Sequence, residues 1–183
     1  MEKRIYIGVD IAQDSFEAGL WQTKGGQPLG HYPNRQEGWE LLAETLRKDN
    51  IEGQGQILLV LEATGGYELG LAAYAYAQNW QVCLPNPKTV RDWAKGSGWR
   101  SKSDRQDALM LAQYGSEKQP APQDELPPHV RELDDLLRRR TDIEQVRQSE
   151  NNRLKGYQQR PHPSQPEIQS LERSIASLDA ELT

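Results

Sequence analysis

The stretch RIYIGVDI, at residues 4–11, is a short run of apolar and β-branched residues interrupted by one carboxylate, Asp10. A run of this length and composition is typical of a strand that is buried in a sheet. A second apolar run, ILLVL at residues 57–61, is followed directly by Glu62. The two runs predict two core strands, each with an acidic residue at its end.

The segments around these runs alternate between strand and helix patterns. The sequence TKGG at residues 23–26 indicates a hairpin between strands at 16–22 and 28–32. Asn34 is expected to cap a following helix whose inner face is Trp39, Leu42 and Leu46. Three early strands followed by strand–helix alternation predict the α/β class, with a mixed sheet covered by helices on both faces. The other expected elements are helices at 67–78, 89–95 and 103–114 and a strand at 81–84.

Composition excludes several classes of protein. The chain has 183 residues but no apolar stretch near the roughly 20 residues that a membrane span needs. Its first ten residues, MEKRIYIGVD, lack the apolar core of a signal peptide. A single cysteine, Cys83, excludes an internal disulfide framework. We therefore expect a cytoplasmic protein with no membrane partner.

Prolines divide the chain after residue 118. Pro120, Pro122, Pro127 and Pro128 lie in one short stretch, which cannot form a helix. The expected organisation is an α/β domain at 1–118, a proline-rich linker at 119–129 and a helical region at 130–183.

The region after the linker shows helical patterns only. Apolar residues there step by three and four, which is the spacing of a coiled-coil seam. The seam consists of Ile168, Leu171, Ile175, Leu178 and Leu182. Two helices joined by a proline-rich turn are expected to pack on each other or on a second chain. The last helix shows no stop signal before Thr183, so the chain resembles a fragment of a longer protein.

The net charge of −5 is an average over segments of opposite sign. Residues 86–105 carry a local net charge of +4, with Trp93 and Trp99 interleaved as stacking surfaces for exposed bases. The basic residues are Lys88, Arg91, Lys95, Arg100, Lys102 and Arg105. Such a run is either a solvated face or a surface for a nucleic-acid backbone, and an acidic site beside it favours the second.

Four carboxylates are candidates for a metal site: Asp10, Glu62, Asp104 and Asp107. Asp104 and Asp107 are three residues apart at the start of an expected helix, so both project from one face. Oxygen ligands without histidine or cysteine suit a hard cation such as Mg²⁺ or Mn²⁺. Two such ions would activate a water and stabilise the leaving oxygen of a phosphodiester. The alternative is that these acids only complement helix and strand ends.

The turn Thr64-Gly65-Gly66 follows Glu62 directly. It leads into an expected helix, whose first N–H groups could contact a phosphate. An ordinary strand-to-helix connection explains the same residues equally well.

Several motifs resemble those of the insertion-sequence 110 (DEDD) transposase family, which is related to the Piv invertases and includes bridge-RNA-guided recombinases. The motifs occur in the family's order and cover most of residues 1–116. They are IGVDIA at 7–12, EATGGY at 62–67, Asn86-Pro87 with Val90-Arg91, KSDRQDA at 102–108 and LAQYG at 111–115.

This resemblance implies a RuvC-like, RNase H-like fold and a catalytic tetrad of Asp10, Glu62, Asp104 and Asp107. The tetrad would hold Mg²⁺, with Mn²⁺ as a substitute, and support DNA cleavage and strand exchange in transposition. The implied partners are DNA, a guide RNA and further copies of the chain, joined through a coiled coil as a dimer or tetramer. Family members also carry a C-terminal domain with a nucleophilic serine, which this chain is expected to lack and to need for full activity.

Three other functions stay open at the level of sequence. The same carboxylates would serve a self-contained, structure-selective nuclease of the Holliday-junction resolvase type. The chain could also be a non-catalytic fragment that binds nucleic acid and self-associates. Finally, residues 8–12 loosely resemble the first phosphate motif of actin-like ATPases and sugar kinases, although the chain is too short for their duplicated domains.

Overall fold

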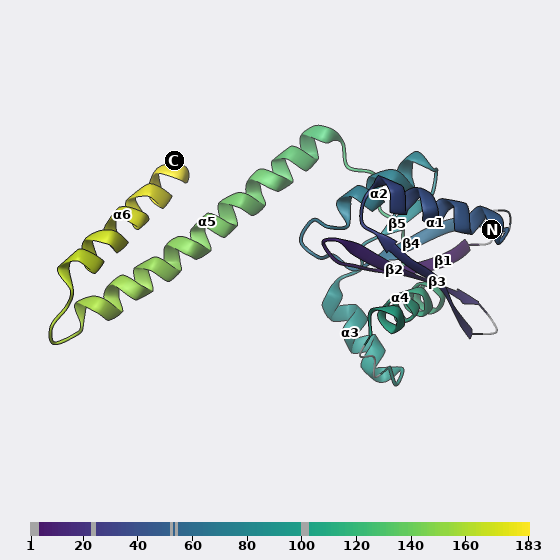
Figure 1. Ribbon diagram of the computed structural model, residues 1–183, viewed down its shortest axis with the longest axis horizontal. Coiled ribbons are helices and arrows are strands. Elements are labelled where there is room, and N and C mark those ends of the chain that lie inside the picture. The colour runs from purple at the N-terminus through teal and green to yellow at the C-terminus, as the bar shows by residue number, and fades with distance from the viewer. Residues whose placement is uncertain (1–3, 23–24, 52, 54, 100–102) are drawn as a thin grey trace. The chain divides into compact units, whose positions relative to one another are not determined.

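The computed structural model describes residues 4–22, 25–51, 53, 55–99 and 103–183. The chain forms two compact units, Met1–Glu125 and Leu126–Thr183. The first unit combines a sheet with helices, and the second is a pair of helices (Figure 1).

Within the described residues, the first unit is built on a five-stranded sheet with the order β3-β2-β1-β4-β5 (Figure 1). The strands are β1 (Arg4–Ile11), β2 (Ser15–Gln22), β3 (Gly25–Pro33), β4 (Gln56–Leu61) and β5 (Gln81–Cys83). β2 is antiparallel to both β1 and β3, whereas β4 is parallel to both β1 and β5. The predicted α/β class and mixed sheet are confirmed, and this strand order is that of the RNase H-like fold.

Helices cover both faces of the sheet, as predicted (Figure 1). They are α1 (Gln36–Lys48), α2 (Leu69–Ala77), α3 (Pro87–Gly96) and α4 (Asp104–Lys118). One buried cluster joins Ile7 of β1 to Leu42 of α1 and Leu71 of α2. A second cluster joins Tyr6, the preceding residue of β1, to α3 and α4. Because successive strand residues point to opposite faces, α1 and α2 lie on one side and α3 and α4 on the other.

The start of α1 differs from the sequence expectation. Arg35 is the N-cap, without a side-chain capping bond, so the prediction that Asn34 caps this helix is wrong. The side chain of Asn34 bonds to two loops instead. The predicted inner face of the helix is correct, because Leu42 and Leu46 are fully buried.

The segment after α4 continues along the sheet. The N–H of Gln123 donates to the carbonyl of Val82 in β5 at 2.8 Å, and the Tyr76 hydroxyl donates to the carbonyl of Gln123 at 3.2 Å. Residues 119–125 therefore belong to the first compact unit.

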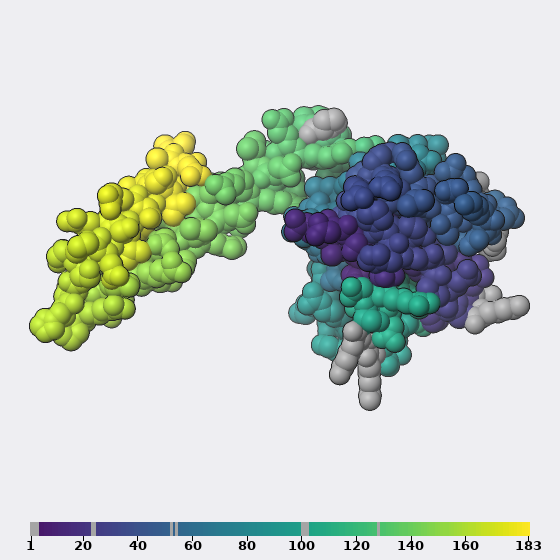
Figure 2. Space-filling view, viewed as in Figure 1, coloured from purple at the N-terminus to yellow at the C-terminus, as the bar shows by residue number. Residues whose placement is uncertain are grey.

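The second unit is an antiparallel pair, α5 (Pro128–Gln158) and α6 (Gln165–Glu181). Arg147 lies 2.8 Å from Asp179, and Arg139 lies 3.1 Å from Glu181. Figure 2 shows α6 covering the later part of α5. The predicted seam of α6 is its least exposed stripe, with Ile168 buried and the other four residues half-buried. Among the described residues, no helix is both long and apolar enough to cross a membrane.

Candidate functional site

Asp10 and Glu62 occupy equivalent positions at the ends of two neighbouring strands. β1 and β4 are parallel, and the last residues paired between them are Val9 and Leu61. Asp10 and Glu62 come next on each strand. Because side chains alternate, both lie on the same face as Gly8, against which α4 packs.

The other two predicted carboxylates come from the first turn of α4. Ser103 is the N-cap, and its carbonyl accepts the N–H groups of Gln106 and Asp107. Asp104 and Asp107 both lie in this turn, where the helix dipole favours negative side chains. The local sequence therefore places two carboxylates at the N-terminal end of the helix that covers β1.

The pKa of Asp10 is affected by all the other carboxylates of this group. Its pKa is raised from 3.8 to about 6, first by burial and then by the negative charges of Asp107, Asp104, Glu62 and Glu17. A neighbouring negative charge disfavours the ionised form of a carboxyl group and so raises its pKa. The structure thus gathers the four predicted carboxylates around one strand end, and their catalytic role stays a prediction.

The gathered carboxylates do not form a closed metal shell. Within the part of the chain that the structure describes, no three His, Cys, Asp or Glu side chains lie close enough together to hold a metal ion. The donor set nevertheless fits a hard divalent cation, because it is all oxygen and its mutual repulsion is what a cation relieves. The raised pKa of Asp10 has burial as its first cause and this repulsion as its second.

A fifth carboxylate, Glu17, was missed by sequence reasoning. Glu17 is paired with Asp10 between β1 and β2, and with His31 between β2 and β3. Its Oε1 lies 3.0 Å from Nδ1 of His31. The signal was present, since a hairpin after β1 places an alternating residue of β2 directly opposite Asp10.

α3, which carries part of the basic segment, contacts the four predicted carboxylates through Arg91. Nη2 of Arg91 in α3 lies 3.5 Å from Oε1 of Glu62. The helix is set in place by Pro87 at its first turn and by Asn86, whose side chain accepts the N–H of Lys88. Arg91 is 69% exposed, so its guanidinium reaches both Glu62 and solvent.

The other predicted basic residues divide into two groups. Lys88 and Lys95 of α3 and Arg105 of α4 are exposed. Arg100 and Lys102 lie outside the described residues. The described part of the basic segment is therefore a solvent-facing surface that adjoins the acidic group through Arg91.

The two tryptophans of this segment serve as packing residues. The ring of Trp93 makes an edge contact with Tyr114 at a centroid distance of 5.3 Å. Trp99 makes an edge contact with Trp21 at 6.1 Å, and its Nε1 donates to Oε1 of Gln113 at 2.7 Å. Both rings are half-buried, so their contacts attach the basic segment to α4 and the sheet.

The glycine turn after Glu62 closes around an internal carboxylate. Glu68, only 2% exposed, accepts the N–H and the hydroxyl of Thr64 at 3.1 and 3.0 Å and the N–H of Gly66 at 3.0 Å. Burial raises the pKa of Glu68, but these hydrogen bonds outweigh it and the net shift is downward. The N–H groups of Thr64 and Gly66 are therefore engaged within the turn, and the contact of the first N–H groups of α2 (Leu69–Ala77) with a phosphate stays a prediction.

Comparison with known proteins agrees with the motifs. The family model of insertion-sequence 110 DEDD transposases, described as "Transposase", matches residues 7–163. The pilin gene-inverting proteins of Moraxella lacunata and Moraxella bovis are each 33% identical over 122 residues, or 64% of this chain. The match covers 36% of each of these relatives, so the chain spans about a third of their length.

Two solved structures of Thermus thermophilus RuvC are also similar. RuvC alone is 15% identical with a TM-score of 0.42, and the match covers 65% of this chain and 99% of RuvC. RuvC in complex with a Holliday junction substrate is 14% identical with a TM-score of 0.40, and the match covers 66% of this chain and 100% of RuvC.

Proposed function

Because the chain belongs to the insertion-sequence 110 (DEDD) transposase family, we propose that it forms the metal-dependent, DNA-cleaving part of a transposase or recombinase. The observation that carries this proposal is the grouping of Asp107, Asp104 and Glu62 around Asp10, whose pKa these residues raise. An isolated surface carboxylate would not have this environment. Complete strand exchange is proposed to need a C-terminal domain as well.

The residues proposed to hold Mg²⁺, or Mn²⁺ in its place, are Asp10, Glu62, Asp104 and Asp107. When bound, these ions supply an activated water or hydroxyl and stabilise the leaving oxygen of a phosphodiester. Asp10 must lose its proton to act as a ligand, and its pKa of about 6 allows this at neutral pH. Arg91 offsets the charge of Glu62 and provides a cation for the phosphate beside it.

The basic surface is proposed to hold the nucleic-acid backbone next to this site. It consists of Lys88, Arg91, Lys95 and Arg105, with Arg100 and Lys102 as further members. Contacts to phosphate fix the register of a nucleic acid without reading its sequence. The surface therefore suits DNA and equally the backbone of a guide RNA, and target choice is left to other parts of the assembly.

The helical region is proposed to join copies of the chain into a dimer or tetramer. In this scheme residues 1–118 are the catalytic domain and 130–183 the coiled coil. Of the predicted linker at 119–129, residues 119–125 belong to the first compact unit and Pro128 begins α5. α5 leaves Leu133, Leu137 and Val146 at least 50% exposed, and apolar side chains exposed along one helix are common at helix–helix contacts.

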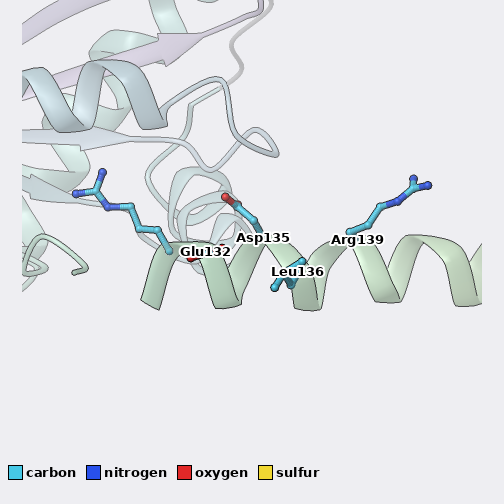
Figure 3. Close-up of a pocket in the computed structure, with 5 residues that line it drawn as sticks. Glu132, Asp135, Leu136 and Arg139 are labelled. Carbon is cyan, nitrogen blue, oxygen red and sulfur yellow. The ribbon is translucent and has the colours of Figure 1, made fainter. Parts of the chain in front are cut away.

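A shallow pocket on the first turns of α5 does not add a ligand site. Figure 3 shows the side chains that line it, Arg131, Glu132, Asp135, Leu136 and Arg139. Charges of both signs alternate along this stretch, and Arg139 is engaged with Glu181. We therefore assign the pocket no ligand.

Light scattering tests the proposed dimer or tetramer, and a strict monomer at micromolar concentration would contradict it.

Metal binding tests the proposed site most directly. Calorimetric titration of the chain with Mn²⁺ should show binding that Asp10→Asn abolishes and that Asp124→Asn, at an exposed position of the same unit, leaves unchanged. Equal binding by all three proteins would overturn the assignment of Asp10.

A cleavage assay with Mg²⁺ and linear or branched DNA then separates the remaining functions. Cleavage by the chain alone, lost in Asp10→Asn, would indicate a self-contained nuclease of the resolvase type. DNA binding without cleavage supports a composite site that needs a further domain. Absence of both DNA binding and cleavage would overturn the proposed function.

A further inference from the structure

The hydrogen-bonded ladder between β1 and β4 stops where the candidate site begins. Its last pair is Val9 and Leu61, one residue before Asp10 and Glu62. β1 continues to pair with β2 as far as Ile11, whereas β4 ends at Leu61. Beyond that point the ladder no longer fixes the distance between the two chain segments.

Asn34 bridges these segments just beyond the end of the ladder. Its Nδ2 donates to the carbonyl of Ala12 and to the carbonyl of Tyr67, each at 3.0 Å. Its Oδ1 accepts the Nε1–H of Trp39 at 3.1 Å, and its backbone N–H donates to the carbonyl of Asp14 at 2.9 Å. The Trp39 bond fixes which end of the amide carries the two donors. Both N–H donors and the oxygen of this side-chain amide are therefore engaged.

The segment that Asn34 holds is rigid enough to transmit its position to Glu62. The carboxylate of Glu68 ties Thr64 and Gly66 together through three hydrogen bonds of 3.0–3.1 Å. Tyr67 lies between Gly66 and Glu68, so its carbonyl belongs to this closed turn. On the other side, Ala12 is two residues from Asp10. A displacement of either carbonyl would therefore move one of the two carboxylates.

We propose that Asn34 is a positioning residue for the carboxylate site: its side-chain amide sets the separation between the segment after Asp10 and the segment after Glu62. This inference rests on the proposed metal-dependent function. Only an amide side chain of this length supplies two donors and one acceptor in one plane, so aspartate or alanine cannot replace it. In this role Asn34 acts through the two segments and is not itself a metal ligand.

The first test needs no metal. Amide hydrogen exchange is compared between the unsubstituted chain, Asn34→Ala and Asn34→Asp. Gln56→Ala is the matched control, because the Gln56 amide also ties a loop carbonyl, that of Asn79 at 2.7 Å, but at the opposite end of β4. Both Asn34 variants should exchange faster at residues 12–14 and 64–68 together, whereas the control should exchange normally there.

The second test measures Mn²⁺ affinity by titration at a temperature where every variant is folded. Groups that orient metal ligands typically change metal affinity by 10–100-fold, so both Asn34 variants should bind Mn²⁺ at least about tenfold more weakly. Gln56→Ala should keep the affinity of the unsubstituted chain. If Asn34 only stabilised the fold, both Asn34 variants would have a lower melting temperature, and the folded variants would bind Mn²⁺ as tightly as the unsubstituted chain.

Either of two results would overturn the inference. One is unchanged exchange in the two segments of both Asn34 variants, and the other is unchanged Mn²⁺ affinity in those variants. Failure of the proposed function has a different signature, because the unsubstituted chain would then bind no Mn²⁺ although its exchange pattern still depended on Asn34. An unsubstituted chain that binds no Mn²⁺ would therefore also contradict the positioning role proposed for Asn34.

Discussion

Gly8 of β1 lies directly against Ala108 of α4, with no room for a side chain between them. A Cβ atom on Gly8 would collide with the carbonyl oxygen of Ala108 and the backbone nitrogen of Ala112. The helix backbone therefore rests on the strand backbone. Asp107 precedes Ala108 and Asp10 follows Gly8 by two residues, so this close approach is what brings the two carboxylates together.

Gly8→Ala tests this packing. The added methyl group meets backbone atoms, which cannot rotate away, so α4 must shift outward. We expect a loss of about 2–3 kcal/mol in the free energy of unfolding, measured with urea, together with weaker Mn²⁺ binding. Gly156→Ala in α5, where a Cβ meets open space, is the control and should be neutral or slightly stabilising. Equal stability of the two variants would contradict the close contact.

Asp10→Asn should stabilise the metal-free protein at neutral pH. The pKa of Asp10, about 6 in the folded chain against an ordinary value of 3.8, means that folding favours the protonated form. The stability that this proton provides is complete below pH 3.8 and is lost as the pH rises through 6. The whole shift would amount to about 3 kcal/mol, and partial solvent exposure reduces the expected gain of the variant to about 1 kcal/mol.

Thermal unfolding in EDTA at pH 4 and at pH 7 measures this effect. The variant should melt above the unsubstituted chain at pH 7 and much closer to it at pH 4. Asp124→Asn, at an exposed position, should show no such difference. Added Mg²⁺ should raise the melting temperature of the unsubstituted chain and of Asp124→Asn but not that of Asp10→Asn, because only Asp10→Asn loses the site. A gain that is the same at both pH values would rule out the charge of Asp10 as its cause.

Local patterns in the sequence were enough to predict the strands and the acids at their ends. A strand buried on both faces must be apolar throughout, so 57–61 was identifiable and Glu62 marked its limit. The start of α4 at Asp104 followed from the same kind of local signal. The contact of α4 with β1 was not predictable, because Gly8 looks like any glycine in a strand until the helix above it is known.

The residues that the sequence reasoning missed act through contacts made by the fold. Asn34 was interpreted as a helix cap, which is its commonest local role, yet its partners lie 22 and 33 positions away. Nothing in the sequence singled out Glu68, because only the turn that closes around it makes it buried. Periodicity reports which face of an element is apolar and carries no information on such distant partners.

Arg91→Ala should weaken nucleic-acid binding and reduce its salt dependence. Arg91 is exposed and lies 3.5 Å from Glu62, so its guanidinium is placed to contact a phosphate bound beside that carboxylate. Loss of one phosphate contact lowers the slope of log K against log salt by about one. Filter binding or fluorescence anisotropy over a salt series measures that slope. Lys48→Ala in α1, on the opposite face of the sheet, removes the same charge and should leave the slope unchanged.

Glu68→Gln should destabilise the first unit, although it replaces a carboxylate by a group of the same shape. The three donors of the turn all bond to Oε2 of Glu68, so an amide oxygen can still accept them, but a neutral amide loses the charge that strengthens these bonds. Hydrogen bonds to a charged group are worth about 1.5–3 kcal/mol, so we expect a loss of about 2 kcal/mol at pH 7 in urea unfolding. Glu44→Gln, at an exposed carboxylate bonded to Lys48, is the control and should change nothing measurable.

The dependence on pH identifies the cause of the Glu68 effect. The pKa of Glu68 is lowered from its ordinary value of 4.5, so its stabilisation is present above that pH and is lost as the pH falls through the lower, folded-state value. The difference between the unsubstituted chain and Glu68→Gln should therefore be largest near pH 7 and shrink as the pH falls through that folded-state value, where the unsubstituted carboxyl becomes neutral as well. A difference that stays constant over this range would show that packing, and not the ionised carboxylate, holds the turn after Glu62.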